Sequence, residues 1–89
     1  MSDDLQTRFE TAAQEAQKLA KKPDNTPLLR LYALYKQATA GNATGTRPGM
    51  ADVVGRAKFD AWEKLKNYPK EKAMQDYVSL VEKLKKTNG

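Results

Sequence analysis

The chain has 89 residues, with 16 lysines and arginines against 11 aspartates and glutamates, so its formal net charge is +5. The length fits one domain, residues 1–89, with a free energy of unfolding of roughly 4 to 13 kcal/mol. The chain contains no cysteine and no histidine, which excludes disulfides, thiolate nucleophiles, imidazole bases and the usual zinc ligands.

The first half of the chain has the pattern of two amphipathic helices. Residues 3–20 place apolar side chains at spacings of three and four, with aspartates at the start and lysines at the end. Pro23 stops this helix. A second helix is predicted over residues 27–40, with Gly41 just past its end in the position that favours glycine. Three residues before it offer N-cap oxygens: Asp24, Asn25 and Thr26.

The second half begins with a long loop and continues with two more helices. Residues 42–50, NATGTRPGM, hold glycines, a proline and turn-forming residues, which indicates an ordered loop. A third helix is predicted over residues 52–66, capped by Asp52 and with Val54 on its apolar side. A fourth helix opens at Pro69, and we expect the tail KKTNG to fray.

These elements predict an all-α fold of four helices, since no segment alternates with period two. A loop as long as residues 42–50 is typical of a functional segment or of a crossover between helices that are not neighbours. We therefore expect a bundle that is not a simple up-down array.

Aromatic and cationic side chains gather on three of the expected helices. Tyr32, Tyr35 and Lys36 share one face of the second helix because they stand at i, i+3 and i+4. Lys58 lies on the third helix and Tyr77 on the fourth. Aromatic rings stack on bases and lysines bind phosphates, so these five side chains would suit a nucleotide.

Each of these residues also has a purely structural interpretation. The two tyrosines of the second helix can be boundary residues with packed rings and solvated hydroxyls. Lys58 can belong to a solvated face, and Tyr77 can be part of the core. Composition alone leaves both interpretations open.

Nothing in the sequence indicates catalysis or metal binding. The acidic residues fall on polar helix faces or at helix starts, and no spaced acidic loop of the calcium-binding kind is present. The glycines of residues 41–49 follow no strand and precede no Lys-Ser or Lys-Thr pair, so a phosphate-binding loop is a poor match. We predict a protein that is not an enzyme and that uses no metal or cofactor.

Four segments resemble the acyl-CoA-binding proteins, a family of small cytosolic carriers of long-chain acyl-CoA esters. They are LYALYKQATAG (31–41), RPGM (47–50), GRAKFDAW (55–62) and KEKAM (70–74), the last followed by Tyr77. Their separations match the family's, and with Phe9 and Pro23 also in register the resemblance covers nearly the whole chain.

The resemblance implies a fold and a site. The helices would run up-down-down-up, with the long loop as an overhand link between the second and third. Tyr32 would stack on the adenine, Tyr35, Lys36 and Lys58 would hold the ribose 3′-phosphate, and Tyr77 would close the nucleotide site. Two leucines would help to line the groove for the acyl chain: Leu28 and Leu29.

Three single positions depart from the family's usual residues, as do the segments before the second and fourth helices, residues 24–27 and 67–69. Phe59 stands where relatives usually carry tryptophan, and Gln17 and Val54 stand where many carry lysine near the ligand. The lost lysines predict a weaker electrostatic contribution to binding.

We therefore predict a non-enzymatic carrier of medium- to long-chain acyl-CoA thioesters, active in lipid transport and fatty acid metabolism. It would deliver them by transient contact with membranes or acyl-CoA-using enzymes. The alternative is a helical module that binds nucleic acid or a protein partner through its basic, aromatic second helix.

The acidic start, MSDDLQ, is unlike a secretory signal, so we expect the chain to begin at Met1 or Ser2. No segment is apolar enough to span a bilayer. Without cysteine we expect a reducing, cytoplasmic setting, and we also expect a monomer.

Overall fold

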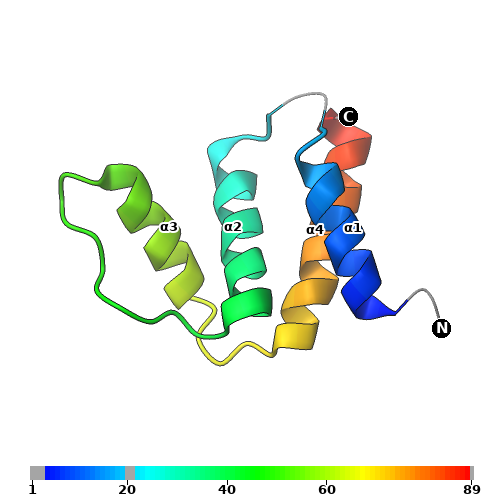
Figure 1. Cartoon of the computed structure of the whole chain (residues 1–89). Coiled ribbons are helices and arrows are strands. Elements are labelled where there is room, and N and C mark those ends of the chain that lie inside the picture. Colours follow the sequence, from blue (N-terminus) through cyan, green and yellow to red (C-terminus); the bar gives the residue numbers. More distant parts are fainter. Residues whose placement is uncertain (1–3, 20–21, 89) are drawn as a thin grey trace.

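Figure 1 shows a computed structural model of the chain, which describes residues 4–19 and 22–88. Within those residues the regular structure consists of four helices: α1 (Leu5–Ala16), α2 (Asn25–Ala40), α3 (Val53–Glu63) and α4 (Lys70–Asn88). In Figure 1, α1 and α4 run in one direction while α2 and α3 run in the opposite one. The predicted all-α class with up-down-down-up order is confirmed, and residues 41–52 form the overhand link between α2 and α3.

The core lies between three of the four helices. α4 packs against both α1 and α2, whereas in the described part of the chain α3 packs against α2 alone. The buried cluster accordingly draws its members from α1, α2 and α4: Phe9, Ala12, Leu31, Leu34, Ala38, Ala73, Tyr77, Val78, Val81 and Leu84. Within the described residues α3 is therefore attached to the bundle through α2 alone, and it contributes no residue to this buried cluster.

The first helix is shorter than predicted. Its start is capped by the Asp4 carboxylate, which accepts a hydrogen bond from the Thr7 amide at 2.8 Å. That bond to the charged form lowers the pKa of Asp4. α1 ends at Ala16 because the amides of Gln17 and Lys18 bond three residues back, which tightens the final turn. The predicted end at Ala20 lies outside the described residues, as does the predicted start at Asp3.

α2 starts two residues before the predicted position. Asp24 is the N-cap, and the Leu28 amide donates to its carbonyl at 3.0 Å. Among the described residues the Asp24 side chain makes no capping hydrogen bond, so the predicted side-chain cap is wrong. Pro27 is the third helical residue and still lies in the first turn, where its missing N–H has no intrahelical partner. Gly41 ends the helix at φ 85°, as predicted from the preference of glycine for this region.

α3 is capped as predicted but ends early. The Asp52 carboxylate accepts a hydrogen bond from the Gly55 amide at 3.0 Å. The helix ends at Glu63 and not at Lys66, because the amides of Leu65 and Lys66 bond three residues back and continue as turns.

The last helix reaches further than predicted. α4 starts at Lys70, one residue after Pro69, and the expected fraying over KKTNG is wrong as far as Asn88. One reason is the ion pair between Lys85 and Glu15 of α1, at 3.0 Å. The Thr87 hydroxyl also donates to the Lys83 carbonyl at 3.2 Å.

The overhand link is fixed to α3 by side chains. Arg47 forms a bidentate ion pair with Asp60, at 2.8 and 2.7 Å. Hydrogen bonding to Arg47 lowers the pKa of Asp60 and raises that of the guanidinium. The Trp62 indole N–H donates to the Gly41 carbonyl at 2.7 Å. These contacts hold α3 beside the end of α2.

A second group of polar side chains joins the link between α2 and α3 to the link between α3 and α4. It lies at the end of the molecule where α2 and α3 end. The Asn42 side-chain oxygen accepts from the Gln37 amide at 2.9 Å and from the Asn67 backbone amide at 2.7 Å. Gln37 also donates to the Tyr68 carbonyl at 3.0 Å. Asn67 has a φ of 69°, a conformation that asparagine tolerates better than most residues. The carboxyl ends of α2 and α3 are therefore held together.

Candidate functional site

A groove of about 600 Å³ lies between the amino-terminal parts of α2 and α3. In Figure 1 these helices are close at their carboxyl ends and diverge toward their amino ends. The groove has apolar walls and a polar rim, formed by Lys22, Asn25, Leu28, Leu29, Tyr32, Val53, Val54, Ala57 and Lys58. Four of the seven predicted site residues therefore meet in one groove: Leu28, Leu29, Tyr32 and Lys58.

Helical spacing explains why these side chains share the groove. Asn25, Leu28 and Tyr32 stand three and four residues apart on α2, so they project from one face. Val54 and Lys58 have the same spacing on α3. Each helix thus presents an apolar strip with a polar or cationic residue at its edge.

Two lysines reach across from one helix to an aromatic ring of the other. The ammonium of Lys58, on α3, lies 5.3 Å from the centre of the Tyr32 ring on α2. The ammonium of Lys36, on α2, lies 4.9 Å from the centre of the Trp62 ring on α3. Both contacts are cation–π interactions. Among the described residues neither lysine forms an ion pair with a carboxylate, so both can bind an anion.

The other two predicted tyrosines form a separate aromatic cluster with Phe9 of α1. The Phe9 ring stacks on Tyr35, with centres 5.6 Å apart, and meets Tyr77 edge-on at 5.1 Å. Tyr77 is 5 % exposed, so its ring belongs to the core, whereas Tyr35 is 43 % exposed. Burial raises the pKa of the Tyr77 phenol, and the neighbouring Tyr35 raises it further. Neither ring lines the groove.

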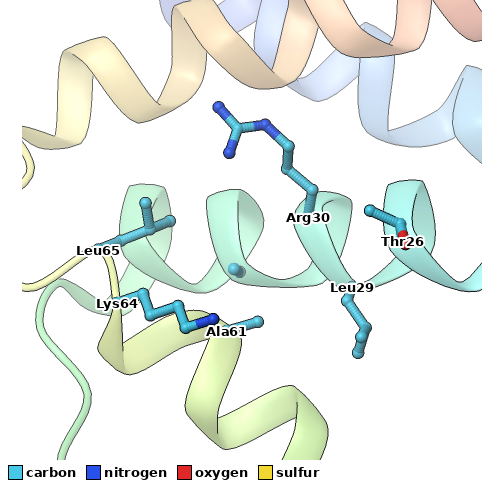
Figure 2. Close-up of a pocket in the computed structure, with 7 residues that line it drawn as sticks. Thr26, Leu29, Arg30, Ala61, Lys64 and Leu65 are labelled. Carbon is cyan, nitrogen blue, oxygen red and sulfur yellow. The ribbon is translucent and has the colours of Figure 1, made fainter.

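A smaller hollow of about 270 Å³ was not predicted from the sequence. Figure 2 shows the residues that line it. It is lined by Thr26, Leu29, Arg30, Ala33, Ala61, Lys64 and Leu65. Leu29 lines this hollow and the groove, so it forms part of the wall between them. In Figure 2 the Arg30 side chain extends away from α3, while Lys64 and Ala61 lie on the α3 side of the hollow.

The positions that depart from the family pattern occupy different environments. Val54 is 64 % exposed and lines the groove. Phe59 is half-buried and meets the edge of Trp62, with ring centres 6.5 Å apart. Gln17 is exposed just after α1 and does not line the groove.

Within residues 4–19 and 22–88, no three acidic side chains come together in a way that could hold a metal ion. None of the helices there is long and apolar enough to cross a membrane. The groove itself presents apolar walls, an aromatic face and lysine ammonium groups.

Comparison with known proteins identifies the family. The family model described as Acyl CoA binding protein matches residues 6–81, and the chain belongs to this family. The resemblance found in the sequence is thus confirmed.

Relatives and solved structures agree with this assignment. The acyl-CoA-binding protein homolog of Manduca sexta is 47 % identical over 81 residues, which cover 90 % of each chain. Acyl-CoA-Binding Protein 2 of Oryza sativa has a similar structure, with a TM-score of 0.89 and 42 % identity, over 93 % of this chain and 90 % of that one. Enoyl-CoA delta isomerase 2 of Rattus norvegicus is 52 % identical over 79 residues, and the matched part spans 89 % of this chain but 20 % of that protein.

Proposed function

We propose that the protein carries medium- to long-chain acyl-CoA thioesters, which it binds in the groove between α2 and α3. The observation that carries this proposal is the composition of the groove, where an apolar wall meets lysine ammonium groups and a tyrosine ring. An acyl-CoA has the matching parts, a long apolar chain joined to a phosphorylated nucleotide. Membership of the acyl-CoA-binding protein family supports the same ligand.

The two parts of the ligand would bind at different places, the acyl chain inside the groove and the nucleotide between its rim and Lys36, which does not line the groove. We propose that the acyl chain contacts Leu28, Leu29 and Val54, where each buried CH₂ contributes ~0.8 kcal/mol. Tyr32 would stack on the adenine, and Lys36 and Lys58 would bind the ribose 3′-phosphate through charge-assisted hydrogen bonds.

The aromatic cluster would form the edge of the nucleotide site. Tyr35, with its exposed edge, would offer its hydroxyl to the 3′-phosphate beside the lysines. Tyr77 lies behind it, with ring centres 6.0 Å apart, so Tyr77 would act by supporting Tyr35 and through its own hydroxyl.

The remaining parts of the proposal rest on the family and on composition. We propose that the chain is a monomer in the cytoplasm, without catalytic activity or a resident cofactor. It would buffer acyl-CoA esters and deliver them by transient contact with membranes or acyl-CoA-using enzymes.

Nucleic-acid binding is less well supported by this groove. A basic, aromatic face of α2 could bind a nucleic acid through its phosphates and bases. The walls of the groove, however, include leucines and valines, and aliphatic walls are not needed to bind either bases or phosphates. A steep dependence of binding on salt, without any response to acyl-CoA, would favour that alternative.

The proposal predicts that palmitoyl-CoA binds far more tightly than either CoA or free palmitate, because only the ester engages both the groove and the nucleotide site. Calorimetric titration with the three ligands measures this directly, and acyl-CoA esters of graded length would give the preferred chain length. Equal affinity for palmitate and its CoA ester would refute the two-part site.

We predict that Lys36→Ala and Lys58→Ala each weaken acyl-CoA binding by roughly 1 to 2 kcal/mol, or about 5- to 30-fold. A charge-assisted hydrogen bond to the phosphate contributes ~1.5 to 3 kcal/mol. To make it, the lysine ammonium gives up its cation–π contact, which costs ~0.5 to 1 kcal/mol, so the net loss in the variant is smaller than the hydrogen bond alone. Lys83→Ala, an exposed lysine on α4, is the matched control and should bind normally.

Titration with an acyl-CoA that lacks the 3′-phosphate tests whether the two lysines bind this phosphate. The wild-type protein should lose a similar amount of affinity for this ligand, and either variant should lose little more. Full additivity of the two losses would show that the lysines bind elsewhere.

A further inference from the structure

Three large apolar side chains at the start of α3 are exposed, which is unusual for one short segment of a small domain. Met50 is 83 % exposed, Val53 is 71 % and Val54 is 64 %. Met50 and Val53 line a common hollow of about 310 Å³, and Val53 and Val54 line the groove. The three side chains therefore form one continuous surface, which we call the apolar tip.

The backbone holds the apolar tip in a defined place. The Asp52 amide donates to the Gly49 carbonyl at 3.0 Å, which closes a turn directly before α3. The Asp52 carboxylate then caps the helix at Gly55. In Figure 1 the start of α3 lies at the edge of the molecule, far from α1 and α4. No described helix other than α2 packs against α3, so the outer side of the tip is open.

Among the described residues that line the hollow and the groove next to the apolar tip, cationic side chains outnumber acidic ones. Arg56 follows the tip on α3 and donates to the Pro48 carbonyl at 3.4 Å, and Lys58 and Lys22 stand on the rim of the adjoining groove. Two acidic residues lie near the tip. Asp52 caps the start of α3, and Asp60, which lines the same hollow as Met50 and Val53, is ion-paired with Arg47. Apolar side chains with cations beside them are the combination that binds the interface of an anionic bilayer.

We propose that the apolar tip is a membrane-contact surface, which inserts Met50 and Val53 among the headgroups of anionic bilayers. Because Val53 and Val54 also line the groove, contact through the tip would place the groove against the lipid. An acyl chain could then pass between the two without crossing water. This inference deepens the proposed function by assigning the surface used for delivery, and its test needs no acyl-CoA.

The test is co-sedimentation of the full chain with vesicles of phosphatidylcholine, with and without phosphatidylserine. The wild-type protein should bind the anionic vesicles several-fold better than the neutral ones. Met50→Glu should lower binding to the anionic vesicles roughly tenfold, since it removes apolar area and adds a like charge. Met50→Leu should retain binding. Gln75→Glu, which makes the same charge change at an exposed position of α4, should bind nearly as well as the wild type.

Calorimetry with palmitoyl-CoA separates this inference from the proposed function. Met50 does not line the groove, so Met50→Glu should bind acyl-CoA normally. Normal acyl-CoA binding without any vesicle binding would refute the membrane surface and leave the carrier function intact. Vesicle binding that depends on Met50, together with a failure to bind acyl-CoA, would refute the carrier function and support the membrane surface. A dimer that Met50→Glu dissociates, with no vesicle binding, would show that a second copy covers the tip and would overturn the inference.

Discussion

Tyr77→Ala is expected to lower the free energy of unfolding by about 3 to 5 kcal/mol, the cost of removing a large buried aromatic side chain. The ring is 5 % exposed and packs edge-on against Phe9 within the cluster that joins α1, α2 and α4. A chain of this size has roughly 4 to 13 kcal/mol of stability in total. The loss would therefore be a large fraction of the total, and the denaturation midpoint should fall clearly.

Urea denaturation followed by circular dichroism measures this loss. Tyr77→Phe keeps the ring and should retain most of the stability, so it separates packing from the hydroxyl. Tyr35→Ala is the matched control, because Tyr35 belongs to the same cluster but is 43 % exposed. It should cost about 1 kcal/mol, the scale of one aromatic pair.

The same variants test the role of Tyr77 in binding. If Tyr77 contributes its hydroxyl to the nucleotide site, Tyr77→Phe should be stable and yet weaker in acyl-CoA binding. If its role is only to support Tyr35, Tyr77→Phe should bind normally. A wild-type denaturation midpoint for Tyr77→Ala would contradict the place of this ring in the core.

The sequence predicts the helices well because their signals are local. Apolar spacing, the cap at Asp52 and the glycine at position 41 are properties of neighbouring residues, and the structure has an element at each of them. The ends were less predictable. α4 continues past the expected fraying partly because Lys85 pairs with Glu15, a contact between residues far apart in the sequence.

The groove shows the same division between local and tertiary information. Helical spacing grouped Tyr32 with Tyr35 and Lys36, but of these three only Tyr32 lines the groove. Leu28 and Leu29 were assigned to the groove by the family resemblance and not by a local pattern. The pairing of Lys58 with Tyr32 depends on how α3 leans against α2, which no local pattern specifies. Val54 is exposed for this reason, since a helix that packs on one side only leaves part of its apolar strip uncovered.

Tyr32→Ala is expected to weaken acyl-CoA binding by about 1 to 3 kcal/mol, the usual cost of removing an aromatic ring from a base. Its denaturation midpoint without ligand should change little, because the half-buried Tyr32 ring lines the groove and lies outside the core cluster. Tyr32→Phe should retain most of the affinity, since the face of the ring makes the proposed contact.

Lys58 makes the test of Tyr32 more specific. Its ammonium lies over the Tyr32 ring, so Tyr32→Ala removes the partner of Lys58 as well as the stacking surface. If Tyr32 acts only by positioning Lys58, Tyr32→Ala combined with Lys58→Ala should bind no more weakly than Lys58→Ala alone. If the ring stacks on the adenine, the double variant should lose the stacking contribution in addition.

Both measurements require the right reference state. Stability must be compared without acyl-CoA, because a ligand that binds the folded chain raises its apparent stability by mass action. Affinity must be measured where Tyr32→Ala is fully folded. A variant that unfolds easily and yet binds acyl-CoA normally at low temperature would show that Tyr32 is a packing residue. The nucleotide would then have to bind outside the groove between α2 and α3.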